Sequence, residues 1–173
     1  MNKKVFLAAV TTVGLIGLSA CGSTESGGAQ KVGENASAPA EKKEQKPQVF
    51  KVGDVVKLGD MQVTLKSAKF VNADQYTPAE KGAVLAIEFE AMNTGKDELY
   101  IGSEEFKIST PDGTQHENYF AFTDGFMNEN IASGKKITGK LYFDVPKDEK
   151  YEIIYKPTFT LSDDKATFEV IPQ

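Results

Sequence analysis

The sequence predicts an all-β fold, an antiparallel immunoglobulin-like β-sandwich of about seven strands, over residues 49–173. Short stretches in which apolar and polar residues alternate are typical of half-buried strands. Turn residues such as Asn-Thr-Gly and Asp-Gly separate these stretches at short intervals. No long stretch shows the period of an amphipathic helix. A cleaved signal peptide and a disordered linker are expected before the domain.

The N-terminus has the pattern of a signal peptide. Lys3 and Lys4 precede an uncharged and mostly apolar run over 5–18. A membrane-spanning helix needs about 20 apolar residues, and polar sequence follows this shorter run at once. The pattern therefore predicts a signal peptide over 1–20 rather than a membrane anchor.

Leu18-Ser19-Ala20-Cys21 resembles the lipobox of bacterial lipoproteins. This resemblance implies that the Cys21 thiol receives a diacylglyceryl group and that a signal peptidase cuts between Ala20 and Cys21. Two or more acyl chains hold a protein on a bilayer, so we expect a lipid-anchored protein on the outer face of the bacterial membrane. The alternative is a plain secreted protein in which Cys21 is incidental.

Residues 21–48 are predicted to be the lipidated cysteine and a flexible linker. Small, polar and charged residues fill this segment, and Val32 is its only large aliphatic residue. Such a composition buries too little apolar surface to offset the entropy of ordering the chain. Cys21 is the only cysteine, so the exported domain has no disulfide and depends on its core.

Three alternating runs define the expected core of the domain. They cover 61–67, 84–93 and 137–146, and shorter β-rich runs follow at 151–157, 158–161 and 167–172. In an alternating strand one face fills the core and the other meets water. Phe89 and Phe143 lie in mid-run on the apolar face, so we expect both to be core residues. A β-barrel is the main alternative to the sandwich.

The order of the motifs in the domain resembles an uncharacterised family of bacterial lipoproteins with an immunoglobulin-like (telokin-like) domain. The features that carry the resemblance are Asn93–Gly95 after a long strand, the Asp112-Gly113 turn, and Gly134 followed by the run Gly139–Pro146. The resemblance covers nearly all of 50–173. It implies an exported protein whose fold is similar to that of a mycobacterial secreted immunogenic protein. It implies no activity and no catalytic residues.

The composition disfavours nucleic-acid binding. The chain contains no arginine and has a net charge of −5, whereas phosphate recognition needs a basic surface. We therefore expect no nucleic-acid partner.

The sequence shows no catalytic constellation, and we predict a non-enzymatic protein without metal or cofactor. His116 is the only histidine, and a metal site would usually need several such ligands. Glu88 and Glu90 could form a hydrolytic carboxylate pair, which gives the rival hypothesis of an envelope-polymer hydrolase using Glu88/Glu90 or His116. Outward-facing glutamates are ordinary on a half-exposed strand, however, and this interpretation is favoured.

The segment 118–130 is rich in aromatic residues, which are enriched at recognition surfaces together with methionine. Period two predicts that Phe120 and Phe122 point inward. Phe126 and Met127 follow a turn and are expected to be partly exposed, forming a candidate binding patch with Tyr119. The alternative is that the segment plugs one end of the sandwich.

The sequence thus favours a binding or adhesion module. Its expected partners are the membrane, through the lipid anchor, and an unknown protein or envelope ligand. Besides the hydrolase, an accessory subunit of a membrane complex remains an alternative.

Overall fold

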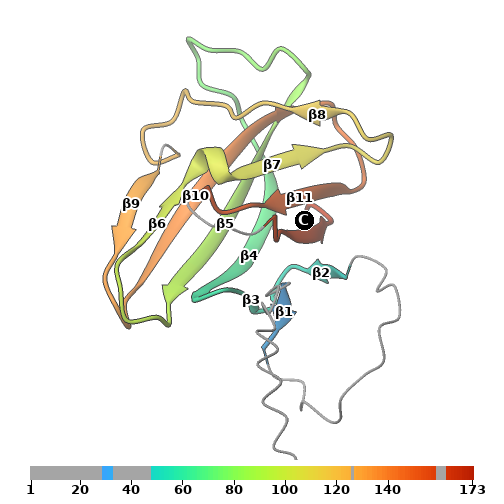
Figure 1. The fold of residues 1–173 in the computed structure, drawn as a ribbon. Helices are drawn as coiled ribbons and strands as arrows, with labels where there is room; N and C mark the ends of the chain where they lie inside the picture. The colour runs from blue at the N-terminus through green and yellow to red at the C-terminus, as the bar shows by residue number, and fades with distance from the viewer. Residues whose placement is uncertain (1–28, 33–47, 126, 159–162) are drawn as a thin grey trace, which may run out of the picture.

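Strands dominate the computed structural model of the protein, which describes residues 29–32, 48–125, 127–158 and 163–173 (Figure 1). The expected signal peptide, Ala20 and Cys21 lie outside the described residues. The elements are β1 (Gln30–Lys31), β2 (Val49–Lys51), β3 (Val56–Leu58), β4 (Met61–Val71), β5 (Ala83–Asn93), β6 (Leu99–Gly102), the 3-10 turn η1 (Ser103–Glu105), β7 (Phe106–Ser109), β8 (Gln115–His116), β9 (Asn128–Ile131), β10 (Lys136–Val145), β11 (Tyr151–Tyr155) and β12 (Ala166–Val170).

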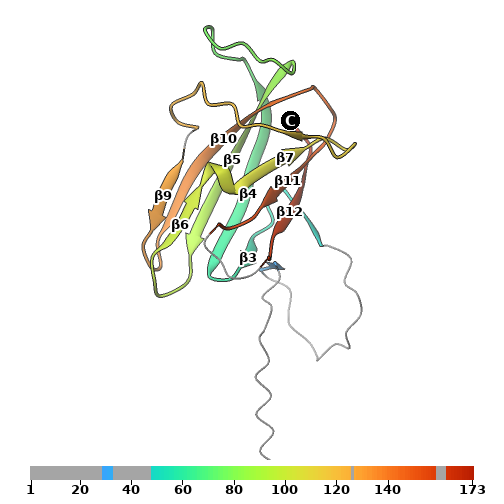
Figure 2. The same cartoon turned by 45° about the horizontal axis from the view of Figure 1, so that its top comes forward.

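Two five-stranded sheets form the body of the domain. One has the order β1-β3-β4-β5-β10, the other has the order β2-β12-β11-β7-β8, and β6 pairs with β9 beside them (Figure 2). All neighbours are antiparallel except β2 and β12, which run parallel. The prediction of an antiparallel β-sandwich is confirmed. The described residues form twelve strands rather than about seven. Four of the twelve, β1, β2, β3 and β8, have only two or three residues each, too few to show an alternating pattern in the sequence.

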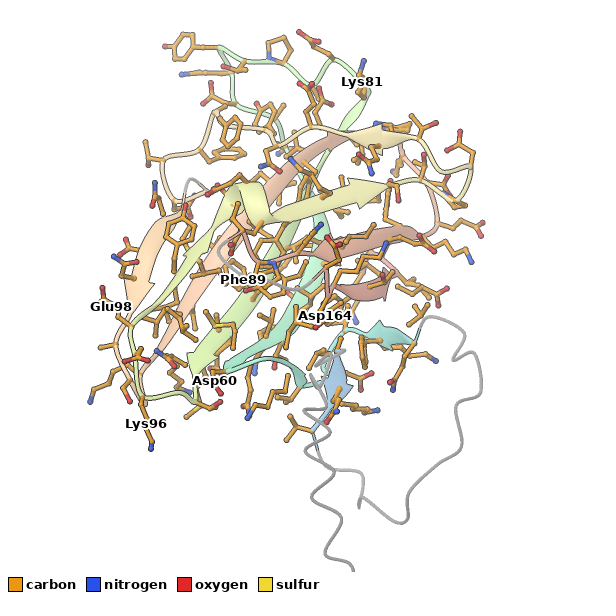
Figure 3. All side chains as sticks on the ribbon, in the orientation of Figure 1. Asp60, Lys81, Phe89, Lys96, Glu98 and Asp164 are labelled. Carbon is orange, nitrogen blue, oxygen red and sulfur yellow. The ribbon has the colours of Figure 1, made fainter. Side chains whose placement is uncertain are left out.

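The alternation in the sequence sets which side chains fill the space between the sheets. Phe89 in β5 and Phe143 in β10 are fully buried, as predicted. Phe89 lies in the interior of the domain (Figure 3), with its ring centroid 5.1 Å from that of Phe106 in the facing sheet. The Phe106 ring in turn packs 4.9 Å from Tyr155. This chain of rings joins the two sheets through apolar contact.

A second, smaller apolar cluster covers the outer face of β5 and β10. Ala86 and Tyr142 alternate with the main core residues, so the alternation predicts that they face water, yet both are buried, together with Val84. Tyr119 packs on them from the segment after β8, with the partly buried Phe122 beside it. The outer face is therefore apolar where another segment covers it and polar elsewhere.

The structure differs from the expected linker at β1. Gln30 and Lys31 pair antiparallel with Lys57 and Val56 of β3, at the edge of the first sheet. The Val32 amide continues this ladder by donating to the Val55 carbonyl at 2.8 Å. The segment 29–32 is thus an added edge strand rather than part of a solvated spacer.

The Asn-Thr-Gly motif has a structural role. Asn93 is fully buried at the end of β5. Its Nδ2 donates to the carbonyls of Asp97 and Ile131, both at 2.7 Å, and its Oδ1 accepts from the Gly95 amide at 2.8 Å. One amide side chain therefore satisfies three backbone groups and ties the β5–β6 turn to β9.

Candidate binding site

Two connecting segments meet at one end of the sandwich. Residues 72–82 join β4 to β5, and residues 115–122 comprise β8 and the chain after it; together we call them the distal end. In both views the loop 72–82 lies at the end of the domain opposite β1 (Figures 1 and 2). The antiparallel course of β4 and β5 carries the loop to this position.

Two side chains hold the loop 72–82 in place. The Tyr119 hydroxyl accepts a hydrogen bond from the Asp74 amide at 2.8 Å and donates to the Thr77 carbonyl. The Asp144 carboxylate in β10 accepts from the Glu80 amide at 2.7 Å and from the Lys81 amide at 3.0 Å. These bonds fix the backbone of the loop, so a ligand would meet an ordered surface and lose less entropy on binding.

An open groove of about 430 Å³ runs between the two segments of the distal end. Polar and charged groups from His116, Glu117 and Lys81 line it. Two large apolar side chains are exposed at this end: Tyr76 is 85% exposed and Phe120 is 60% exposed. Aromatic side chains beside a polar groove are typical of recognition surfaces.

The predicted orientation of the aromatic segment is wrong at two residues. Phe120 is exposed rather than buried, and Met127 is buried rather than exposed. Residues 120–125 form turns and bends instead of a strand, so period two does not apply to them. Tyr119 is also buried, and Phe122 is partly buried.

Tyr119 and Phe122 turn inward because they pack with each other and with Tyr142. The ring centroids of Phe122 and Tyr142 lie 4.6 Å apart, and those of Tyr119 and Phe122 lie 5.5 Å apart. Phe126 lies outside the described residues. The binding patch of Tyr119, Phe126 and Met127 is therefore corrected, with Tyr76 and Phe120 as the exposed aromatic pair.

Met127 enters the main core because Gly139 leaves room for it. A Cβ on Gly139 would lie 1.8 Å from the Met127 Cε and 3.0 Å from the Phe89 ring. This explains the glycine at the start of the run Gly139–Pro146. No local pattern around Met127 could have shown it, because the space is made by a residue of another strand.

Glu88 and Glu90 form surface interactions on β5. The Glu90 carboxylate lies 3.0 Å from the Lys136 ammonium, and this hydrogen bond holds the pKa of Glu90 below its ordinary value. Glu88 accepts a hydrogen bond from the Ser67 hydroxyl at 3.0 Å. A hydrolytic pair needs one carboxyl whose pKa is raised so that it can act as an acid. This geometry therefore favours a solvated, ion-paired sheet face.

His116 lies in β8, directly after the turn that joins β7 to β8. Its Nε2 lies 3.2 Å from the Thr110 hydroxyl, and that hydroxyl donates to Asp112 at 2.6 Å. In a catalytic triad the acid orients the imidazole rather than the hydroxyl. Asp112 also accepts from the Thr114 amide at 2.9 Å. Gly113 has φ 86°, a conformation that favours glycine. The arrangement thus shapes a tight turn.

No group of three or more His, Cys, Asp or Glu side chains in the described ranges is placed to hold a metal ion. In the same part of the chain, no helix has the length and apolar character needed to cross a membrane.

The two packed, mostly antiparallel sheets define a β-sandwich domain, and comparison with known proteins shows the family. The model of the domain of unknown function DUF4352 matches residues 50–166, so the chain belongs to this family. A curated relative, the uncharacterized lipoprotein YcdA of Bacillus subtilis, is 32% identical over 126 residues. The match covers 68% of this chain and 32% of YcdA, so the chain spans about a third of that relative's length.

Solved structures agree with the expected resemblance. The YcdA structure is 25% identical with a TM-score of 0.58, covering 66% of this chain and 38% of that one. The yjhA protein of Bacillus subtilis is 21% identical with a TM-score of 0.57, covering 70% and 99%. The secreted protein MPT63 of Mycobacterium tuberculosis is 19% identical with a TM-score of 0.55, covering 73% and 98%. The predicted resemblance to a lipoprotein family and to a mycobacterial secreted protein is confirmed.

Proposed function

We propose that the protein is a lipoprotein, anchored through Cys21 to the outer face of the bacterial membrane, whose distal end binds a protein or another envelope component. The lipobox-like Leu18–Cys21 supports the anchor, and the name of the curated relative supports the class. Cleavage between Ala20 and Cys21 belongs to the same proposal. The domain boundaries are then 1–20, 21–48 and 49–173, with β1 docked onto the domain.

Strand β1 supports a definite geometry for the anchored domain. Cys21 and Ala29 are eight residues apart, and a chain spans at most about 3.3–3.6 Å per residue. The edge of the first sheet therefore lies within roughly 30 Å of the lipidated residue. A linker that was solvated up to residue 48 would allow about three times that distance. The domain is held near the bilayer with its distal end pointing away.

The observation that carries the binding function is the pair of exposed aromatic side chains on a loop system fixed by Tyr119 and Asp144. Tyr76 and Phe120 offer apolar surface that a partner can cover, and aromatic side chains are enriched at recognition surfaces. The groove that Phe120 helps to line offers hydrogen-bond donors and acceptors on both sides. A surface of this kind suits a neutral or mixed-charge ligand, and the lack of arginine disfavours nucleic acid.

Site-specific photocrosslinking in the native membrane tests this function. A photoreactive amino acid at Phe120 should capture one defined partner. The same residue at Val49 is the matched control, because Val49 is 50% exposed and lies in β2, at the edge of its sheet opposite β8. We expect a strong adduct from position 120 and none from position 49, and a weaker adduct when Tyr119→Phe loosens the loop. Equal labelling at both positions, or no adduct at 120, would contradict the proposal.

A further inference from the structure

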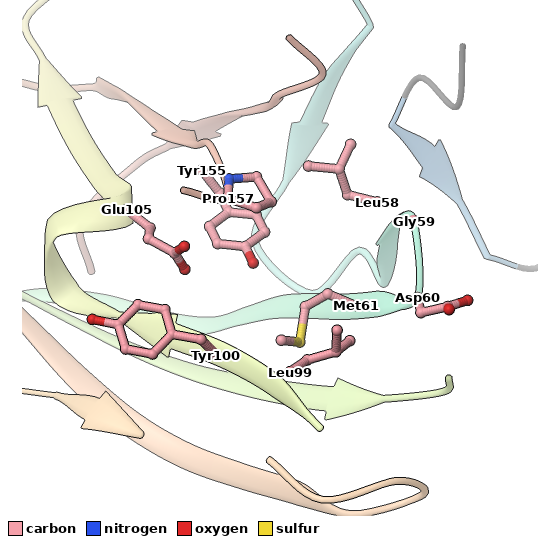
Figure 4. Close-up of a pocket in the computed structure, with 9 residues that line it drawn as sticks. All are labelled: Leu58, Gly59, Asp60, Met61, Leu99, Tyr100, Glu105, Tyr155 and Pro157. Carbon is pink, nitrogen blue, oxygen red and sulfur yellow. The ribbon is translucent and has the colours of Figure 1, made fainter. Parts of the chain in front are cut away.

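A small, partly open cavity lies away from the distal end, beside the β3–β4 turn (Figure 4). Its volume is about 100 Å³. Leu58, Met61, Leu99 and Pro157 give it mainly apolar walls, and Tyr100 and Tyr155 add aromatic rings. An apolar cavity of about 150 Å³ in another protein binds benzene. This one therefore has room for a ligand of about five non-hydrogen atoms.

The Tyr155 hydroxyl is an unusual feature of this cavity. Tyr155 is 1% exposed, and among the described residues its hydroxyl has no hydrogen-bond partner. Its hydroxyl end points into the space between Glu105 and Met61 (Figure 4). A buried hydroxyl without a partner costs about 1–3 kcal/mol. The cavity therefore holds a polar group whose partner must come from outside the described protein.

Glu105 brings a negative charge to the same cavity. Its side chain is buried, and its Oε1 accepts hydrogen bonds from the Thr158 amide at 2.7 Å and the Thr158 hydroxyl at 2.6 Å. Its Oε2 accepts only a long bond, 3.3 Å, from the Gly102 amide. No lysine in the described ranges forms an ion pair with it. A buried carboxylate with a partly used oxygen is a site for a cation.

We propose that this cavity binds a primary ammonium group carried on a short aliphatic chain. The chain occupies the apolar walls, and the ammonium donates hydrogen bonds to Glu105 Oε2 and to the Tyr155 oxygen. An ammonium has three donors and no acceptor, so it matches two oxygen acceptors. The aromatic faces of the tyrosines add attraction for a cation. A carboxylate ligand is repelled by Glu105, and an alcohol of equal size lacks the charge.

The residues that line this cavity include neither Cys21 nor any residue of the distal end. A test of the ammonium site is therefore independent of a test of the proposed function. The ammonium could belong to a free alkylamine or to a lysine side chain of a peptide. Both sources present the same ammonium group to Glu105 and Tyr155. They differ in size at the mouth of the cavity, because a lysine side chain remains attached to its peptide and a free alkylamine does not.

Binding to the full-length chain in detergent tests the site, with n-butylammonium, n-butanol and butyrate as probes. We expect saturable binding of n-butylammonium in a titration followed by NMR of the ligand. Butanol should bind at least about tenfold more weakly, since charge-assisted bonds are worth about 1.5–3 kcal/mol. Butyrate should not bind. Nα-acetyl-lysine amide separates the sources: its binding assigns the site to peptide lysines, and its exclusion assigns it to free amines.

Three variants connect the binding to the cavity. Glu105→Gln should weaken n-butylammonium at least about tenfold, and Tyr155→Phe several-fold. Tyr142→Phe, which removes a hydroxyl from the opposite face of the sheet, is the matched control and should bind like the wild type. If Glu105→Gln does not fold, Tyr155→Phe carries the test. Equal affinity for butanol and butylammonium, or unchanged binding in the folded Tyr155 and Glu105 variants, would overturn the proposal.

Discussion

The Lys31 ammonium lies 2.8 Å from the Asp54 carboxylate, which links the segment after the proposed anchor to the domain. Asp54 also accepts a hydrogen bond from the Lys51 amide at 2.9 Å. The Lys31 hydrogen bond, followed by that of Lys51, holds the pKa of Asp54 below its ordinary value. One carboxylate therefore fastens β1 and also shapes the turn that follows β2.

Asp54→Asn should loosen β1 without unfolding the domain. A partly exposed ion pair is worth up to about 1 kcal/mol, so the hydrogen-exchange protection of the Val32 amide should fall by up to about fivefold. Asp124→Asn removes a similar surface pair with Lys140 of β10, the strand at the opposite edge of this sheet from β1, and should leave Val32 unchanged. Equal protection of Val32 in the wild type and in Asp54→Asn would contradict this role.

The same pair predicts a pH dependence. Because the pKa of Asp54 is lowered in the folded protein, its contribution to docking is fully present above the ordinary value of about 3.9. It is lost as the pH falls through the lowered folded pKa. We expect Val32 protection, corrected for intrinsic exchange, to be the same at pH 7 and pH 5 and to fall only in stronger acid. A loss of protection between pH 7 and pH 5 would assign the docking to another group.

Asn93→Ala should destabilise the domain by about 2–4 kcal/mol, because it removes a fully buried side chain that bonds the carbonyls of Asp97 and Ile131 and the Gly95 amide. Asn93→Asp should be worse at pH 7, since a carboxylate would face the carbonyls of Asp97 and Ile131, and protonation at low pH should restore part of the loss. Chemical denaturation measures both effects. Thr94→Ala, in the same turn but exposed, should cost less than about 1 kcal/mol. A cost for Asn93→Ala as small as that of the control would refute the structural role of the motif.

The pH dependence of stability that we expect from Glu105 has the opposite sign to that expected from Asp54. Burial is the main cause that raises the pKa of Glu105, against the opposing effect of its bonds from Thr158. The folded state therefore keeps this proton to a higher pH than the unfolded chain does. As the pH rises from about 4 through the raised pKa, the free energy of unfolding should fall in the wild type relative to Glu105→Gln. Chemical denaturation of the wild type and of Glu105→Gln from pH 3 to 8 measures this change in the free energy of unfolding. Glu104→Gln, at an exposed residue, is the control. A difference between wild type and Glu105→Gln that does not vary with pH would contradict the prediction.

The sequence predicts the core because apolar residues alternate with polar ones along a strand that is covered on one side only. Phe89 and Phe143 follow this rule, and their burial needs only the strands themselves. Tyr142 does not follow it, because its cover comes from residues 119–122, a segment that no local pattern places on β10. Chain segments distant in sequence thus decide the exceptions.

The site was harder to predict than the core for related reasons. Phe120 and Met127 lie in a segment without a strand period. The neighbouring Phe122 packs on Tyr142, and Met127 fills space that the missing Cβ of Gly139 leaves. Strand β1 has two residues, too few for any period, and is held by backbone bonds to β3. The cavity at Tyr155 joins residues far apart in the sequence and leaves no motif.

The central claim, a domain anchored through Cys21, is tested most directly by metabolic labelling with an alkyne fatty acid in the native bacterium. Wild type and Cys21→Ala are compared, with labelling, precursor size and membrane fractionation as readouts. Under the proposal the lipid is attached to the Cys21 thiol and the cut precedes Cys21, so the wild type should carry label, be processed and sediment with membranes. Cys21→Ala should remain uncut and unlabelled. Equal label on both proteins, or no label on the wild type, would contradict the anchor.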